Sequence, residues 1–198
     1  MENKFENIYW EENTEIIGID EAGRGPLAGP LVVAGVKFKV GYKNDLINDS
    51  KKISEKKRNE LFDIIIRDAS EYYWEIVSTE VIDKENIYRA TQNAMGRVAD
   101  KLSSNVVLTD AMPLLNSKKT VMPIVKGDQK SISISAASIL AKVIRDRCMI
   151  EYDKQYPKYG FAKHKGYPTK QHLQALKNEG VLEIHRKTYR PVAELLKK

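Results

Sequence analysis

The chain alternates short apolar runs with longer amphipathic stretches. The runs at 16–19 and 31–34 have the length and the β-branched content of buried strands, and a glycine-rich loop joins them. This pattern predicts an opening hairpin. Further strands are predicted at 72–81, 105–108 and 121–125.

Between and after these strands, apolar residues recur at helical spacing. Ser54 is placed to cap one helix, and small alanines on one side of the longest helix would let it lie close against a sheet. The predicted helices begin at Glu55, span 84–102, span about 131–152, run from a capping Thr169 to a closing Gly180, and begin at Arg190. Strands that alternate with helices in this way indicate an α/β fold.

The C-terminal part of the chain mixes tyrosines with lysines. This composition is typical of a helical flap that carries aromatic and basic side chains, and equally of a packing lobe with half-buried tyrosines. No proline- and glycine-rich linker separates it from the rest. We therefore expect residues 1–198 to form a single domain, with a core over about 14–155 and a helical C-terminal lobe over about 156–198.

Charge and cysteine content narrow the possible partners. The chain of 198 residues has a formal net charge of +6 and a sequence pI near 9.2. This excess favours a polyanionic partner, nucleic acid first, although it is also compatible with an ordinary solvated surface. The single cysteine, Cys148, excludes an intrachain disulfide. Without a signal-peptide core or an apolar run of membrane-span length, we expect a cytoplasmic protein.

Two adjacent acids, Asp20 and Glu21, follow the first apolar run. Side chains alternate across a strand, so a pair inside a regular strand would bury one carboxylate without a partner. We therefore expect the pair at the strand's end, where both carboxylates can turn to the same place. Two convergent carboxylates suit a hard cation such as Mg2+. A solvated turn is the alternative, because turns favour acidic residues.

Glycines flank an arginine directly after these acids, at Gly23, Arg24 and Gly25. Glycine permits positive φ and a close approach of the backbone to another molecule, with the amides turned outward. Such a loop suits a sugar-phosphate chain. It matches neither the phosphate-loop nor the dinucleotide-binding fingerprint.

Two more acids follow predicted strands, Asp110 after 105–108 and Asp128 after 121–125. Ligands gather at the carboxyl ends of strands in α/β sheets, so these carboxylates and the acid pair could share one site. Four carboxylates that hold two divalent ions roughly 4 Å apart would suit phosphodiester hydrolysis. Asp128 could instead cap the helix that follows it, where the helix dipole favours a negative charge.

Five motifs follow one another along the chain. They are Asp20-Glu21-Ala22-Gly23-Arg24-Gly25-Pro26, Asp49-Ser50-Lys51-Lys52, Lys126-Gly127-Asp128, the segment 135–143 with Arg145-Asp146, and His164-Lys165-Gly166-Tyr167. In this order they resemble type 2 ribonuclease H, or ribonuclease HII, from about Thr14 to Val192. The resemblance covers nearly the whole chain, and its motifs are highly specific.

This resemblance implies a fold, an activity and a cofactor. The fold is a ribonuclease H-like mixed five-stranded sheet flanked by helices, with a helical C-terminal lobe. The activity is that of an endoribonuclease that degrades the RNA strand of RNA/DNA hybrids and cuts 5′ of single ribonucleotides in duplex DNA. Two Mg2+ or Mn2+ ions would support hydrolysis to 3′-hydroxyl and 5′-phosphate ends. We expect the protein to act as a monomer on these nucleic acids, without a membrane.

The resemblance also implies roles for particular residues. The metal-binding and catalytic positions are taken by Asp20, Glu21, Asp110 and Asp128. The positions that recognise the RNA-to-DNA junction are taken by Gly23, Arg24, Gly25 and Tyr167. Lys51 and Lys52 are candidate phosphate contacts, with an ordinary solvated loop as the alternative.

Some details depart from the pattern or fall outside it. The third acid lies in Thr109-Asp110-Ala111, where the family often has Val-Asp-Gly. Ribonuclease HIII is similar in its core, but it has a different loop after the acid pair and a long N-terminal domain, so the second type fits better. The alternatives are a nuclease without activity on single ribonucleotides and a catalytically silent RNA-binding module.

Other conspicuous side chains receive structural interpretations. The three histidines, at His164, His172 and His185, lack metal-ligand spacing, which favours structural or surface roles. Asp146 is expected to form a local ion pair with its neighbours Arg145 and Arg147.

Overall fold

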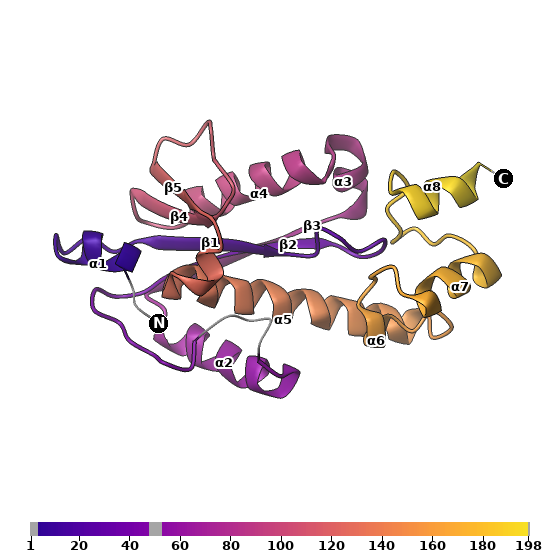
Figure 1. Cartoon of the computed structure of the whole chain (residues 1–198), viewed down its shortest axis with the longest axis horizontal. Helices are drawn as coiled ribbons and strands as arrows, with labels where there is room; N and C mark the ends of the chain where they lie inside the picture. Colours follow the sequence, from indigo (N-terminus) through magenta and orange to yellow (C-terminus); the bar gives the residue numbers. More distant parts are fainter. Residues whose placement is uncertain (1–3, 48–52, 198) are drawn as a thin grey trace.

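A computed structural model describes residues 4–47 and 53–197 of the chain (Figure 1). One sheet lies between two layers of helices, and the C-terminal helices extend from one end of it. The strands are β1 (Ile17–Ala22), β2 (Leu31–Lys37), β3 (Glu71–Val77), β4 (Val106–Asp110) and β5 (Thr120–Ile124). The helices are α1 (Lys4–Trp10), α2 (Glu55–Asp68), α3 (Thr79–Glu85), α4 (Ile87–Lys101), α5 (Ile132–Gln155), α6 (Phe161–His164), α7 (Lys170–Glu179) and α8 (Arg190–Leu196), with a 3-10 turn η1 (Gly127–Gln129).

The five strands form a mixed sheet in the order β3-β2-β1-β4-β5. β1, β2 and β3 are antiparallel neighbours, whereas β4 pairs parallel to β1 and β5 parallel to β4. The predicted opening hairpin and the mixed five-stranded fold are both confirmed. Because β1, β4 and β5 run in the same direction, their carboxyl ends lie at one end of the sheet. Asp20 and Glu21 near the end of β1, Asp110 at the end of β4 and Asp128 after β5 therefore lie toward this end.

The apolar runs of the sequence become the middle of the sheet. All of β2 is buried, since its two faces meet different layers. Val32, Ala34 and Val36 pack with α2 and α5, whereas Leu31 and Val33 pack with α4. A strand covered on both faces is apolar at successive positions, and this explains why the run does not alternate.

Helix α5 lies unusually close to the centre of the sheet. A Cβ atom on Gly18 of β1 would come within 2.2 Å of the Ser133 carbonyl carbon and 2.3 Å of the Ile134 nitrogen. The predicted alanine side of the helix, which includes Ala136 and Ala137, is fully buried in the same layer. Small residues on both elements therefore set the short distance between helix and strand.

The boundaries of two predicted elements were wrong. The strand predicted over 72–81 ends at Val77, because the Ser78 side chain accepts a hydrogen bond from the backbone of Val81 and caps α3. The helix predicted over 84–102 is split at Asn86, which has φ of 64° and caps α4 with its own side chain. Both changes follow from polar side chains that form local caps.

The N-terminal helix α1 was not predicted, and it fixes the start of α5. Glu6 of α1 is fully buried. Its Oε1 atom accepts hydrogen bonds from Ser131 Oγ at 2.5 Å and from the backbone nitrogen of Ser133 at 3.1 Å. A carboxylate at the N-terminus of a long helix is also favoured by the helix dipole.

The C-terminal helices pack against the loop between β1 and β2 (Figure 1). The Leu27 nitrogen donates to the Gly166 carbonyl at 2.8 Å, and the Gly29 nitrogen donates to the Ile184 carbonyl at 2.8 Å. Tyr159 is buried, so part of this region forms a packed lobe. No helix in the described part of the chain combines the length and apolar character needed to cross a membrane.

The three histidines lie together inside this lobe, in agreement with a structural role. All three are buried. His172 Nε2 lies 3.1 Å from His185 Nε2, and the rings of His164 and His172 stack with their centroids 4.5 Å apart. Burial lowers the pKa of His172 and that of His185 to about 4, so both rings are neutral at neutral pH.

Candidate active site

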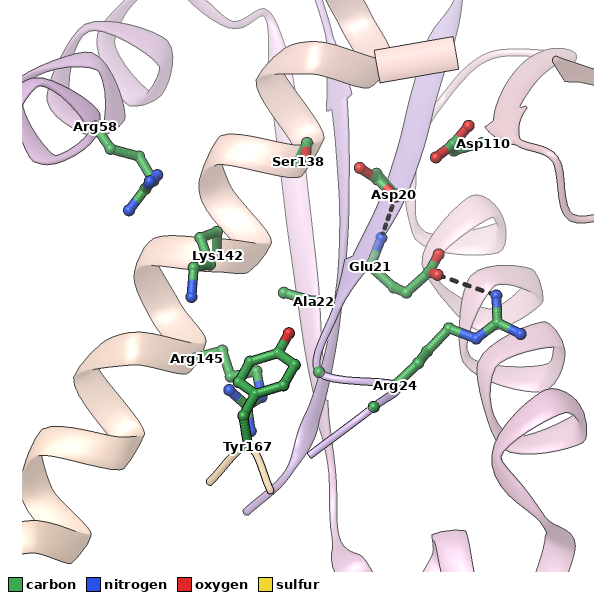
Figure 2. A pocket seen from close by; sticks show the side chains of 12 residues that line it. Asp20, Glu21, Ala22, Arg24, Arg58, Asp110, Ser138, Lys142, Arg145 and Tyr167 are labelled. Atoms are coloured by element: carbon green, nitrogen blue, oxygen red, sulfur yellow. Dashed lines mark hydrogen bonds and ion pairs between the residues drawn. The ribbon is translucent and has the colours of Figure 1, made fainter. Parts of the chain in front are cut away.

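A cavity of about 270 Å³ opens beside the carboxyl end of β1 (Figure 2). Elements far apart in sequence contribute to its wall: the ends of β1 and β4, the loop after β1, helices α2 and α5, and the C-terminal lobe. The lining residues are Asp20, Glu21, Ala22, Gly23, Arg24, Gly25, Arg58, Asp110, Ser138, Lys142, Arg145 and Tyr167. The cavity therefore places acidic side chains, a glycine-rich backbone and basic side chains around one space.

Three carboxylates face this space. Figure 2 shows the carboxylates of Asp20 and Asp110 turned toward one another, whereas that of Glu21 turns toward Arg24. Asp20 is buried, and its Oδ1 atom accepts a hydrogen bond from the Glu21 nitrogen at 2.7 Å. Burial raises the pKa of Asp20 well above its usual value, and the charges of Glu21 and Asp110 raise it further. The three acids thus repel one another in the absence of a cation.

Two of these acids are fixed by neighbouring polar groups. Asp110 Oδ1 accepts a hydrogen bond from the Gly127 nitrogen at 2.8 Å, which ties the end of β4 to the start of η1. Glu21 Oε1 lies 3.4 Å from Arg24 Nη1. This ion pair places the Arg24 side chain of the glycine loop beside Glu21.

The fourth predicted acid, Asp128, does not line the cavity. It is 1% exposed within η1, directly before α5. Within residues 4–47 and 53–197, no three acidic, histidine or cysteine side chains are arranged closely enough to hold a metal ion. The structure therefore brings Asp20, Glu21 and Asp110 together with the glycine loop and Tyr167, and leaves Asp128 beside them in a buried turn.

The glycine loop is held by two buried arginines. Arg145 of α5 donates from Nε to the Pro30 carbonyl at 3.0 Å and from Nη2 to the Ala28 carbonyl at 3.2 Å. Arg186 approaches the loop from the C-terminal segment and donates to the carbonyl of Gly23 at 2.6 Å. Gly23 has φ of 104°, and a Cβ atom there would come within 2.2 Å of Arg145 Nε. Position 23 therefore requires glycine, both because of the positive φ and because a side chain would clash with the Arg145 guanidinium.

One face of α5 supplies cavity residues to which the sequence analysis gave no function. Ser138, Lys142 and Arg145 recur at a spacing of four and three residues, so they share one side of the helix. Ser138 hydrogen-bonds to Asp20, and this contact opposes the rise in the pKa of Asp20. Burial lowers the pKa of Lys142 and, with the charge of Arg186, lowers that of Arg145 to about 10. The helical periodicity of these polar residues was the signal that could have identified them.

The basic side of the cavity also corrects one predicted ion pair. Asp146 accepts from Lys142 Nζ at 2.7 Å and lies 3.9 Å from Arg58 Nη1, instead of pairing with Arg145 or Arg147. Residues four apart face each other on a helix, whereas adjacent residues do not.

The pair Lys51 and Lys52 lies outside the described residues. Tyr167 is 43% exposed at the mouth of the cavity, with the Arg145 guanidinium 5.9 Å from its ring centre.

Comparisons with known proteins identify the fold and the family. The sequence model of the ribonuclease HII family matches residues 17–192. Ribonuclease HII from Francisella tularensis subsp. tularensis is 54% identical over 183 residues, which cover 91% of this chain and 98% of the relative. The chain belongs to the ribonuclease HII family. It is therefore a metal-dependent endoribonuclease that cleaves RNA in RNA/DNA hybrids and at ribonucleotides embedded in DNA.

Solved structures agree with this assignment to ribonuclease HII. The ribonuclease H2 of Pyrococcus horikoshii OT3 superposes with a TM-score of 0.76 at 26% identity, covering 92% of this chain and 97% of that one. Ribonuclease HII of Archaeoglobus fulgidus has the same TM-score and identity, with coverage of 88% and 94%. A ribonuclease HIII structure shares the fold at 14% identity and a TM-score of 0.70, and this chain covers 72% of its length. The choice of the second type over the third is confirmed.

Proposed function

We propose that this ribonuclease HII cuts on the 5′ side of a ribonucleotide at the cavity beside β1, within a single catalytic domain that acts as a monomer. One observation carries the proposal: acids from the ends of β1 and β4 line the same cavity as the glycine loop and Tyr167. The proposed metal ligands and the proposed surface for a sugar-phosphate chain are thus adjacent. Asp20, Glu21, Asp110 and Asp128 are the proposed catalytic and metal-binding residues.

The residues fit divalent cations in donor chemistry and in charge. Carboxylate oxygens are the ligands that Mg2+ and Mn2+ prefer. Burial first, and then the charges of Glu21 and Asp110, raise the pKa of Asp20, and a cation would offset the repulsion among these charges. Asp128 lies in η1, whose neighbour Gly127 already bonds to Asp110. The fourth carboxylate is therefore on a turn that is hydrogen-bonded to the third. Two ions bound by these acids would supply an activated water and neutralise charge on the attacked phosphate.

The chain's own residues would orient the substrate for this reaction. The backbone of Gly23, Arg24 and Gly25, which lines the cavity, would present its amides to the ribose and phosphate at the RNA-to-DNA junction. Tyr167 offers a flat surface for the adjacent sugar. Arg145 Nη1 is buried in the cavity wall without a hydrogen-bond partner among the described residues, which suits contact with a phosphate oxygen. The 2′-hydroxyl is then recognised and is not the nucleophile, so the products are a 3′-hydroxyl and a 5′-phosphate.

Cleavage of a duplex with one embedded ribonucleotide tests the carboxylate roles. Turnover should fall by orders of magnitude in Asp20→Asn, Glu21→Gln, Asp110→Asn and Asp128→Asn, and wild-type cleavage should require Mg2+ or Mn2+. Circular dichroism should show that each variant is folded. Full activity in any one variant would remove that residue from the site, and sequencing of the product ends checks the position of the cut.

The substrate-binding role is tested with Tyr167→Ala. A single embedded ribonucleotide offers one distinguishing 2′-hydroxyl, whereas a continuous hybrid offers many equivalent registers. We expect the variant to lose more of its rate on the first substrate than on the second. Equal loss on both substrates, with a lowered melting temperature, would assign Tyr167 to packing of the lobe.

Contacts with substrate phosphates complete the proposal. Lys51 and Lys52 precede α2, whose Arg58 lines the basic side of the cavity. Two lysines just before a helix that contributes to this side are candidates for contact with a substrate strand. Their replacement should therefore reduce the salt dependence of binding, because fewer counterions would be released.

A further inference from the structure

The carbonyl groups of the glycine loop converge on one buried side chain. Arg186, which lies after α7 and is fully buried, donates from Nη2 to the Gly23 carbonyl at 2.6 Å and from Nη1 to the Arg24 carbonyl at 3.0 Å. Its Nε and Nη2 atoms lie 3.2 and 3.0 Å from the Gly29 carbonyl. One guanidinium thus binds three carbonyls on both arms of the loop.

A tyrosine from the same segment supports this arrangement. The Tyr189 hydroxyl donates to the Arg24 carbonyl at 2.7 Å and accepts from Arg186 Nη1 at 3.0 Å. The Arg186 guanidinium also lies 5.1 Å from the Tyr189 ring centre. Two donors therefore meet at the Arg24 carbonyl, which restricts the orientation of that peptide group.

Burying the charged Arg186 guanidinium costs desolvation free energy. Among the described residues, no carboxylate forms an ion pair with Arg186, and burial of the guanidinium lowers its pKa. Apolar side chains could hold the two arms together without burying a charge. They could not fix the direction of individual carbonyl groups, which the planar guanidinium does through several hydrogen bonds at once.

The direction of these carbonyls determines the direction of the amides. A trans peptide is planar and its N–H points opposite to its C=O. The Gly23 carbonyl shares a peptide with the Arg24 nitrogen, and the Arg24 carbonyl shares one with the Gly25 nitrogen. Both N–H groups therefore point away from Arg186, which is buried behind the loop, while Gly23, Arg24 and Gly25 line the cavity.

We propose that Arg186 and Tyr189 are positioning residues for recognition of the ribose. They turn the amides of Arg24 and Gly25 toward the sugar-phosphate at the RNA-to-DNA junction, so that the C-terminal segment sets the preference for a single embedded ribonucleotide. This inference rests on the proposed role of the glycine loop. It adds two residues that neither touch the cavity nor carry out the reaction.

Tyr189→Phe is the informative variant because it removes one hydroxyl and keeps the ring. Tyr159→Phe is the matched control, since the Tyr159 hydroxyl also donates to a carbonyl in the same lobe, that of Gly180 at 2.8 Å, away from the loop. KM and kcat are measured for full-length protein with Mg2+, on a duplex with one ribonucleotide and on a continuous hybrid. Melting curves are recorded for the same preparations, and Arg186→Lys is added as a stronger perturbation.

In Tyr189→Phe, we expect KM for the single-ribonucleotide duplex to rise about threefold to tenfold, the range that one neutral hydrogen bond supports. KM for the hybrid should change less than twofold, and the melting temperature should match that of Tyr159→Phe. Arg186→Lys should change the ratio of the two KM values in the same direction by a larger factor. Unchanged KM values in Tyr189→Phe, or equal rises on both substrates with a lowered melting temperature, would overturn the positioning role.

The same assay separates this inference from the function on which it rests. If Tyr167→Ala reduces the preference for the single ribonucleotide and Tyr189→Phe does not, the positioning role alone is wrong. If neither Tyr167→Ala nor Tyr189→Phe changes the preference, recognition at this cavity is wrong and the positioning role falls with it. A change in Tyr189→Phe alone supports the positioning role and removes the tyrosine contact.

Discussion

Replacement of Gly18 by alanine would change the distance between the central strand and helix α5. The added Cβ would lie 2.2 Å from the Ser133 carbonyl carbon, whereas ordinary contact begins at 3.4 Å. The difference, 3.4 − 2.2 = 1.2 Å, is the separation that must be gained. The obstructing atoms belong to the backbone of α5, so a side-chain rotation cannot relieve the contact. β1, α5 or both must move.

This movement would reach the active site from both sides. Gly18 and Asp20 lie on the same face of β1, and the clashing end of α5 directly follows the turn that holds Asp128. A misplacement of about 1 Å can reduce an enzymatic rate by roughly 100-fold. Insertion of a methyl group into a packed core costs about 1 to 3 kcal/mol. For a chain of this size, that cost corresponds to a fall in melting temperature of about 2 to 12 °C.

Single-turnover cleavage of a single-ribonucleotide duplex, beside a melting curve, measures both effects of Gly18→Ala. We expect a loss of about 100-fold in rate at a temperature where the variant remains folded. Gly96→Ala is the matched control, because Gly96 lies inside α4 and no atom lies within 4 Å of its added Cβ. That control should melt higher, since alanine favours a helix by about 1 kcal/mol over glycine, and it should cleave normally.

A Gly18→Ala variant that cleaves at the wild-type rate and melts normally would contradict this expectation. Such a result would mean that β1 and α5 can accommodate the added methyl group despite the short contact at Gly18. A large fall in melting temperature with a normal rate below it would show that the site tolerates the displacement. In that case the carboxylates are not placed by the distance between β1 and α5.

Three further outcomes follow from charge and burial. The pKa of Asp20 is higher in the folded state than in the unfolded state, so the protein loses stability as the pH rises from the unfolded-state pKa through the folded-state pKa. Asp20→Asn should therefore raise the melting temperature of metal-free protein at pH 7.5, and a lower melting temperature would contradict this. Because the pKa values of His172 and His185 are lowered to about 4, the melting temperature should fall as pH decreases from about 6.5 toward 4, and a flat profile would argue against buried neutral rings. Affinity for a hybrid should fall steeply with salt, and the double replacement of Lys51 and Lys52 by alanine should flatten that slope in a titration, whereas an unchanged slope would leave both lysines solvated.

The sequence predicted those parts of the fold that depend on local pattern. Ser54 and Thr169 cap α2 and α7 as expected, because a side-chain cap is a short-range signal. The acid pair lies near the end of β1, as predicted, but both acids are still paired within the strand, and Glu21 turns toward Arg24 instead of entering the loop. The resemblance to ribonuclease HII added the mixed five-stranded sheet, whereas the strand order came from the structure, because local pattern does not determine it.

Other features depend on contacts between distant residues and could not be inferred locally. The positive φ of Asn86, which splits the predicted helix, depends on its own side chain capping the second half. Arg186 resembles any surface arginine in the sequence, and only the packing of the lobe places it beneath the glycine loop. The orientation of Asp128 likewise depends on the packing of η1, which the sequence around it does not determine.

The contact between Arg186 and the glycine loop joins the two ends of the chain. Its hydrogen bonds to the carbonyls of Gly23 and Arg24 span 163 and 162 residues. At roughly 5 to 20 residues per second, a ribosome makes the arginine about 8 to 30 s after the loop. A nascent chain therefore has the acid pair long before it has the side chain that binds these carbonyls. The loop cannot form these hydrogen bonds until Arg186 has been synthesised, so this wall of the cavity is assembled later in translation than its acids.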